Sequence, residues 1–310
     1  MNILVYGTGG VGGYFGSKLA QAGNKVTFVA RGKHLDAIQK NGLQLKSIEG
    51  NYTVFPVNAV NDVSKLHDLF DVIIVGTKSW QVKNAAENIK KVVSENTLVL
   101  PLQNGVSNVE NLLSHLPKKN VLAGMCKIYA KIEDYGIINH FAFKPEVYFG
   151  EITNEKSSRV LSLKKQFENA GIYTIVPEDI YVEIWNKFLF ILTVSGLGAL
   201  TRVPIGVMFQ DDEVRELMRK TLQEAYRVGI AKGINLSENT VENILNFIGK
   251  QSYNSTASTQ RDIMEGRPSE LENFNGYIVE EGKKLGVSTP VNAFIYQCLL
   301  PQEKMARGLI

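Results

Sequence analysis

A glycine-rich hexapeptide near the N-terminus constrains the fold more than any other feature of this chain. An apolar run at residues 2–6 leads directly into Gly7-Thr8-Gly9-Gly10-Val11-Gly12, and helical spacing of apolar residues continues to residue 22. In such a strand–turn–helix unit, the first glycine allows the tight turn, the second lets a pyrophosphate approach the backbone, and the third lets the helix pack on the sheet. A plain turn would not need three glycines at these offsets. The pattern therefore predicts a dinucleotide-binding loop formed by residues 7–12.

Strand-like and helix-like segments alternate through the first half of the chain. Short apolar runs lie at 25–29, 71–75 and 97–100, with a helical stretch at 80–93. Repeated units of this kind predict an α/β fold with a Rossmann-type, doubly wound parallel sheet. Further strands are expected around 121–130, 136–142 and 147–150, as an antiparallel extension of that sheet.

The chain changes character near residue 177. Pro177 followed by two acidic residues is typical of a helix start. Long helical patterns then lie at 178–199, 211–232, 238–249, 270–285 and 290–300. At roughly 150 residues per domain, a chain of 310 residues fits two domains. We predict a nucleotide-binding domain at 1–177 and an all-helical domain at 178–310, which would bind substrate and could pair two subunits as a homodimer.

The residue that follows the second strand of a dinucleotide-binding fold selects between the two nicotinamide cofactors. NAD-specific folds place Asp or Glu there to bind the ribose 2′-hydroxyl, whereas this chain has Arg31. A carboxylate repels a 2′-phosphate, and a guanidinium binds it through charged hydrogen bonds. Arg31 therefore predicts NADP as cofactor. The alternative is a solvated surface arginine.

The composition argues against several classes of protein. The 34 basic and 31 acidic residues leave a net charge of +3 with both signs interspersed, which favours neither nucleic acid nor a membrane surface as partner. Two cysteines are too few for a disulfide scaffold, and the four histidines lack the spacing of a metal site. The longest apolar run, 188–193, is too short to span a bilayer, and no secretory signal is visible. We therefore expect a cytoplasmic protein without a metal site.

Two polar residues follow strands at the edge where such sheets bind ligands. Lys78 comes just after the strand that ends at 75, and Asn104 after the one that ends at 100. Lys78 could contact the cofactor or a substrate carboxylate, and Asn104 could orient the nicotinamide ribose or the reacting carbonyl. From the pattern alone, the alternatives are equally good: a surface charge beside a helix for Lys78, and an ordinary turn pair for Asn104-Gly105.

Lys187 is the only lysine embedded in the apolar start of the second half, between Ile184 and Ile191. We expect its ammonium to enter a cleft between the domains. There it would stabilise the negative charge that forms on a ketone oxygen during hydride transfer, and it would supply the proton. The alternative is a surface ion pair with Glu183, four residues earlier. Glu270, from pattern alone, is an acidic residue at a helix N-terminus.

Taken together, these residues resemble the ketopantoate reductase (2-dehydropantoate 2-reductase) family over essentially the whole chain. The matching motifs are Gly7 to Gly12, Arg31, Thr77-Lys78 with Trp80-Gln81, Gln103-Asn104-Gly105, Trp185 with Lys187, Ser258 through Arg261-Asp262-Ile263 to Glu270, Asn275-Gly276, and Gly286 to Asn292. The resemblance implies NADPH-dependent reduction of the 2-oxo group of ketopantoate to pantoate, in pantothenate biosynthesis. It implies that Lys187 is the general acid and that Glu270 is its catalytic or substrate-binding partner. It also implies that Lys78 and Asn104 contact cofactor and substrate, and that Ser258 helps to hold the substrate.

The chain departs from the family pattern on one helical face. The family usually has asparagines four and eight residues after the catalytic lysine, and here these positions are Ile191 and Ser195. Ser195 stays a candidate for substrate binding, but Ile191 has no hydrogen-bonding group, and such a loss reduces discrimination between substrates. Two alternatives to ketopantoate reduction therefore stay open. One is a reductase of a different, more apolar 2-oxo acid, and the other is a non-catalytic NADP-binding sensor.

Overall fold

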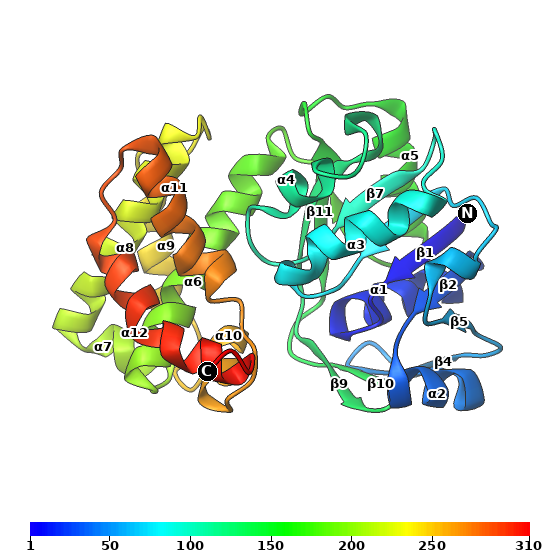
Figure 1. Ribbon diagram of the computed structural model, residues 1–310, viewed down its shortest axis with the longest axis horizontal. Coiled ribbons are helices and arrows are strands. Elements are labelled where there is room, and N and C mark those ends of the chain that lie inside the picture. Colours follow the sequence, from blue (N-terminus) through cyan, green and yellow to red (C-terminus); the bar gives the residue numbers. More distant parts are fainter. The chain divides into compact units, whose positions relative to one another are not determined.

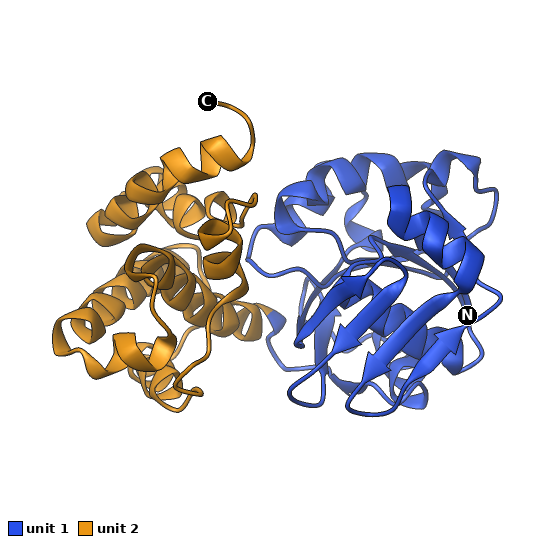
Figure 2. Ribbon diagram, turned by 90° about the horizontal axis from the view of Figure 1, so that it is seen from below, with its two compact units in different colours: residues 1–180 blue, residues 181–310 orange.

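A five-stranded parallel sheet forms the centre of the first part of the chain. The computed structural model describes all residues 1–310, which divide into two units, Met1–Ile180 and Tyr181–Ile310 (Figure 2). The order in the sheet is β5-β2-β1-β6-β7, and all neighbours are parallel. These strands are β1 (Asn2–Tyr6), β2 (Lys25–Val29), β5 (Asn58–Val60), β6 (Val72–Val75) and β7 (Leu98–Pro101). The predicted parallel sheet is confirmed, and its strands are almost entirely buried, as strands covered on both faces are.

Among the helices of the first unit, α1 (Gly10–Gln21) connects β1 to β2 and α3 (Val82–Ile89) connects β6 to β7, whereas the others lead to strands outside this sheet (Figure 1). The others are α2 (Gly32–Asn41), α4 (Asn108–Leu113) and α5 (Ser158–Asn169). The stretch predicted as one helix at 80–93 is α3 flanked by two short 3₁₀ turns, Ser79–Gln81 and Lys90–Val92. Helix α1 packs between the parallel sheet and a second, smaller sheet, which explains why Tyr14 and Phe15 are fully buried on it.

The three predicted late strands of this unit exist, but they belong to two separate sheets rather than to one extension. One sheet has the order β4-β3-β10-β9 and the other β12-β11-β8. Their members are β3 (Leu43–Ser47), β4 (Tyr52–Val54), β9 (Ala130–Asp134) and β10 (Ile137–His140), then β8 (Leu122–Lys127), β11 (Glu146–Glu151) and β12 (Tyr173–Ile175). The predicted antiparallel pairing holds for β8 with β11 and for β9 with β10.

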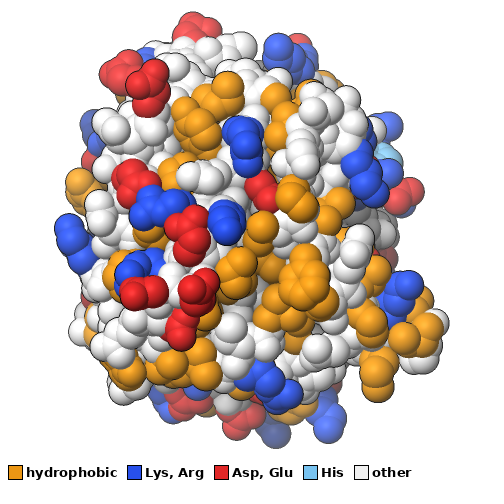
Figure 3. Space-filling view, turned by 90° about the vertical axis from the view of Figure 1, so that its left-hand side faces the viewer, with side chains coloured by type: hydrophobic (Ala, Val, Ile, Leu, Met, Phe, Trp, Pro, Cys, Tyr) orange, Lys and Arg blue, Asp and Glu red, His pale blue; other side chains and the backbone are white.

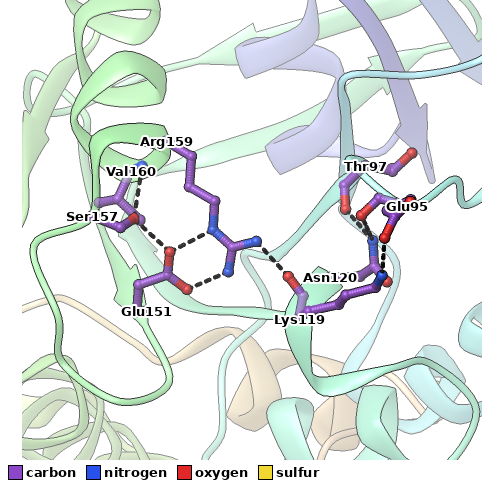
Figure 4. Close-up of polar contacts among 8 residues, drawn as sticks. All are labelled: Glu95, Thr97, Lys119, Asn120, Glu151, Ser157, Arg159 and Val160. Atoms are coloured by element: carbon purple, nitrogen blue, oxygen red, sulfur yellow. Dashed lines mark hydrogen bonds and ion pairs between the residues drawn. The ribbon is translucent and has the colours of Figure 1, made fainter.

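A charged pair joins α5 to the end of β11 (Figure 4). Arg159 donates two hydrogen bonds of 2.6 Å to the buried carboxylate of Glu151 and a third to the Lys119 carbonyl. Ser157 donates to the same carboxylate at 2.6 Å and accepts from the Val160 N–H, so it also caps the helix. Burial alone would raise the pKa of Glu151, but the hydrogen bonds from Arg159 and Ser157 hold it below its usual value.

The second unit is entirely helical, as predicted. Its helices are α6 (Ile180–Thr201), α7 (Ile205–Gln210), α8 (Asp212–Ala231), α9 (Thr240–Gly249), α10 (Ser258–Met264), α11 (Tyr277–Leu285) and α12 (Pro290–Ala306). The single helix predicted at 270–285 is interrupted, because a π-helical segment, η5 (Glu272–Gly276), precedes α11. Segments of π-helix are rare and occur frequently at functional sites.

Helix α6 corrects the prediction that no apolar segment is long enough to cross a membrane. It has 22 residues and a hydropathy of 1.4, so it meets that requirement by length and composition. The sequence argument took residues 188–193 as the longest apolar run and treated its extension to Leu200, through Thr, Ser and Gly, as interrupted, whereas the helix continues through these residues to Thr201. Of its most apolar window, 67% is buried inside the protein, and the core helix of a soluble protein passes the same test.

Charged side chains of both signs are mixed on the surface. Figure 3 shows one face of the molecule, on which basic and acidic side chains lie next to one another between apolar patches. Ion pairs such as Lys284 with Glu280, and Arg219 with Glu242, join neighbouring residues of opposite charge. This arrangement agrees with the small net charge of the sequence.

Candidate active site

The glycine loop after β1 has the geometry that its sequence predicts. Gly7 has φ +101°, a conformation that favours glycine. A side-chain carbon at Gly12 would collide with the Gly7 carbonyl oxygen, whereas one at Gly9 would meet no atom within 4 Å. The loop is therefore closed on the side of α1 and open at Gly9, where a phosphate could approach the backbone and the first amides of the helix.

Gly10 lies against a segment that sequence reasoning did not connect with the loop. A side-chain carbon at Gly10 would collide with the backbone carbonyl of Ala130, the first residue of β9. The start of β9 therefore borders the glycine loop. No local signal in the sequence indicates this contact, because it joins residues 120 positions apart.

The loops after β1, β6 and β7 are joined at the carboxyl edge of the sheet. Gly7 approaches Thr77, so that a side-chain carbon on it would lie 2.8 Å from the Thr77 backbone nitrogen. The Gln103 amide donates to the Thr77 hydroxyl at 3.4 Å. Lys78 and Asn104 immediately follow these two residues, so both predicted site residues belong to loops that meet at this edge.

The two residues differ in exposure and support. Lys78 is exposed, with its ammonium 5.6 Å from the centre of the Trp80 ring. Asn104 is half-buried in a loop held by Asn108, whose amide donates to the carbonyls of residues 103, 104 and 105, each at 3.2 Å. Asn108 is thus a supporting residue that the sequence analysis missed.

Arg31 is the second residue after the end of β2 and is the N-cap of α2. Its side chain is exposed, and its backbone is extended with φ −137° and ψ 155°. The end of β2 is tied to the glycine loop, because the backbone N–H and the hydroxyl of Thr8 both donate to the Val29 carbonyl, at 3.1 and 2.9 Å. Arg31 therefore lies two residues beyond an anchor of the glycine loop.

The remaining predicted residues belong to the second unit, where α6 carries three of them. Lys187, Ile191 and Ser195 recur every four residues and so share one face of this helix. Lys187 and Ile191 are half-buried, and Ser195 is 2% exposed. Elsewhere on α6, Trp185 packs closely against α8, because Gly229 of α8 has no side chain and leaves room for the Trp185 ring.

Two glycines of α6 show which segments pack against it, and these segments carry the remaining candidate residues. Gly196 approaches the side chain of Asn275 in η5, and Gly198 approaches that of Gln260 in α10. Glu270, 4% exposed, lies two residues before η5, and Ser258 is the exposed first residue of α10. Segments carrying Ser258 and Glu270 are therefore packed beside the part of α6 that follows Ser195. The structure thus groups the nucleotide-loop candidates in one unit and the proposed catalytic residues in the other.

Comparisons with known proteins extend over both units. The family model described as ketopantoate reductase PanE/ApbA matches residues 3–154, and that of its C-terminal part matches residues 179–303. An uncharacterized oxidoreductase of Bacillus subtilis (strain 168), YkpB, is 29% identical over 297 residues, which is 96% of this chain and 97% of that protein.

Solved structures give the same correspondence. A PanE/ApbA family ketopantoate reductase from Ralstonia eutropha JMP134 superimposes with a TM-score of 0.90 at 28% identity, over 99% of this chain and 100% of that one. A D-mandelate dehydrogenase solved with NADH and anilino(oxo)acetate superimposes with a TM-score of 0.89 at 23% identity, again over 99% and 100%, and this likeness shows a common fold.

Proposed function

Because the chain belongs to the ketopantoate reductase family, we propose that it is an NADPH-dependent reductase that converts the 2-oxo group of ketopantoate to the hydroxyl group of pantoate. The observation that carries this proposal is the joined carboxyl edge of the first unit, where Gly9 opens onto free space beside the loops of Lys78 and Asn104. Pantothenate biosynthesis is the corresponding pathway role. Neither Cys126 nor Cys298 forms a disulfide, which fits a reducing compartment such as the cytoplasm.

The cofactor would be held by residues 7–12 and Arg31. Open space at Gly9 and the free amides at the start of α1 suit a pyrophosphate, and the exposed guanidinium of Arg31 suits a 2′-phosphate. Lys78 and Asn104 would contact the cofactor and the substrate from the neighbouring loops. Bound there, NADPH supplies the hydride that the 2-oxo carbon receives.

We assign proton donation and substrate binding to side chains of the second unit. Lys187 places a positive charge at the ketone oxygen, stabilises the negative charge that develops there, and donates the proton. Glu270 orients the substrate and favours the charged form of Lys187. Ser195 and Ser258 supply hydroxyl groups for the polar ends of the substrate.

A specific observation favours a second candidate substrate. Ile191 presents an apolar side chain on the face that carries Lys187 and Ser195. A more apolar 2-oxo acid would therefore lose less affinity here than at a site lined with amides. A non-catalytic NADP-binding sensor is the third candidate, although it would not need Lys187 and Glu270.

One assay separates these candidates. NADPH oxidation is followed with ketopantoate, 2-oxoisovalerate and phenylglyoxylate as substrates, each also with NADH. The highest kcat/KM with ketopantoate and NADPH supports the proposed function. A preference for either of the other acids identifies the second candidate. Cofactor binding without oxidation in any reaction identifies the sensor.

A further inference from the structure

His34 connects the glycine loop to two other segments of the first unit. It is the third residue of α2 and is half-buried. Its Nε2 lies 2.8 Å from the carbonyl oxygen of Thr8, and its Nδ1 lies 3.0 Å from the backbone nitrogen of Gly136, in the turn between β9 and β10. Of these residues, only Thr8 was assigned a role from the sequence, as part of the dinucleotide-binding loop.

The two contacts fix the protonation state of the imidazole. The Gly136 N–H is a donor, so Nδ1 must accept and carries no proton. The Thr8 carbonyl is an acceptor, so Nε2 carries the proton and donates it. The ring that satisfies both partners is therefore the neutral Nε2–H tautomer.

Thr8 is thereby held on both sides of its backbone. Its N–H and hydroxyl donate to Val29 of β2, and its carbonyl accepts from His34 of α2. The carbonyl of residue 8 and the N–H of residue 9 belong to one peptide plane, so fixing the carbonyl also sets the direction of the Gly9 N–H. That amide lies in the open part of the loop.

We propose that His34 is a positioning residue for the dinucleotide, which holds the loop amides toward the phosphates only while its imidazole is neutral. This inference rests on the proposed function. A second proton would lie on Nδ1 and point at the Gly136 N–H, so protonation replaces this hydrogen bond by two opposed donors. Nε2 keeps its proton, and the loop is released because the repulsion at Gly136 moves the ring away from the Thr8 carbonyl.

The surroundings of His34 favour the neutral form. Burial lowers the pKa of His34 from its usual value, and this outweighs the opposite effect of the bond to Thr8. The N-terminal end of α2 also disfavours a positive charge. The glycine loop carries no ionisable side chain, and α2 with its N-cap and the β9–β10 hairpin carry the charged or titratable side chains of Arg31, Lys33, Asp36, Lys40, Lys131, Glu133, Asp134, Tyr135 and His140. Cofactor affinity is therefore full above the pKa of His34 and falls as the pH drops through it.

The test is calorimetric titration of the full chain with NADP⁺ and with NAD⁺ from about pH 8 to pH 5, the range in which histidine titrates. NAD⁺ is included because the 2′-phosphate of NADP⁺ itself titrates near pH 6, as phosphate monoesters do. His34→Leu removes both hydrogen bonds, and His34→Gln keeps a donor for Thr8 that does not titrate. His67→Gln changes an exposed histidine and is the matched control.

Wild type and His67→Gln should lose affinity for NAD⁺ as the pH falls, by about 3- to 30-fold for one titrating group. His34→Leu should bind about 5- to 50-fold more weakly at pH 8, with no such dependence. His34→Gln should retain most of the affinity and also lose the dependence. If wild type binds the nucleotides but all variants show the same pH dependence of affinity, the role of His34 is overturned and the proposed function stands. If wild type binds neither nucleotide, both fail.

Discussion

Ser269 donates three hydrogen bonds to the carboxylate of Glu303. Its backbone N–H contacts the two oxygens at 3.0 and 3.1 Å, and its hydroxyl contacts one of them at 2.5 Å. Glu303 is 1% exposed, and Arg307 balances its charge through a bond of 2.6 Å while also donating to the Ser269 carbonyl at 3.0 Å. The end of α12 therefore fixes the residue that immediately precedes Glu270.

Removing this carboxylate should destabilise the second unit. Glu303→Ala removes the carboxylate that accepts from the Ser269 N–H, from its hydroxyl and from the Arg307 Nε, which should lower the free energy of unfolding by about 2–4 kcal/mol. Urea denaturation measures this change in the free energy of unfolding. Lys304→Ala, at the next and exposed position of α12, should change it by less than about 0.5 kcal/mol. Equal stability of the two variants would show that the buried carboxylate does not hold this turn.

The choice of cofactor depends on Arg31 in the proposed function. Arg31→Ala should weaken NADPH binding by about 10- to 100-fold, the worth of a charge-assisted contact, and leave NADH binding nearly unchanged. Fluorescence titration with both nucleotides measures the two affinities. Lys33→Ala removes an exposed charge two residues away and should alter neither by more than a small factor. Equal affinities of the wild type for NADPH and NADH would contradict the assignment.

The pair of Glu151 and Arg159 makes the stability of the first unit depend on pH. Arg159→Met should lower the free energy of unfolding at neutral pH by about 1–3 kcal/mol, below the loss for fully buried pairs because Arg159 is partly exposed. The pKa of Glu151 is lowered in the fold, so this stabilisation is present above the unfolded pKa of about 4.3 and is lost as the pH falls through the folded pKa. The gap between wild type and variant should therefore shrink below about pH 4.

Urea denaturation at neutral and acid pH follows that gap. Lys156→Met breaks the exposed pair with Glu178 and should cost about 0–1 kcal/mol at either pH. A gap that stays constant with pH would exclude Glu151 as its source.

The sequence predicted those parts of the fold whose signals are local. The apolar run of β1 and the three glycines after it determine a turn and a helix without help from distant residues. In contrast, β5 has only three residues and exists because Thr27, Phe28 and Val29 of β2 provide an edge for it. Strand β3 was also missed, although Leu43 and Leu45 alternate as buried residues, because five residues are too short for periodicity to separate a strand from a turn.

The same distinction applies to the candidate site. Arg31, Lys78 and Asn104 were selected because each follows a strand, and strand ends are visible in the sequence. The roles of His34 and Asn108 arise only when the fold brings a donor or acceptor to a loop carbonyl. A lone histidine within α2 and an asparagine after a turn have many ordinary explanations, so their local sequence carries no comparable signal.

The substrate preference should respond to Ile191. Ile191→Asn adds an amide on the face of Lys187 and should raise kcat/KM for ketopantoate by about 5- to 50-fold, because an added hydrogen bond to a polar substrate has this value. Ile230→Asn alters an isoleucine that is 43% exposed on α8 and controls for general effects of the substitution. Steady-state kinetics with ketopantoate and phenylglyoxylate measure the change. If Ile191→Asn leaves the ratio of the two kcat/KM values as it was, this helical face does not bind the substrate.

Lys187 is expected to dominate the chemical step. The alkoxide that forms on the 2-oxo carbon needs a positive partner and a proton. Lys187 is half-buried on α6, where its sequence neighbours Ile184, Trp185 and Phe188 are buried. Lys187→Ala should lower kcat by about 10²–10⁴, the usual worth of general acid catalysis, with little effect on NADPH affinity. Lys220→Ala, on the exposed face of α8, should retain full turnover. Because an alanine leaves space for a small amine, added methylamine should restore part of the rate of Lys187→Ala and none of any rate lost through misfolding. Nearly full turnover by Lys187→Ala would instead make this lysine a structural partner of Glu183.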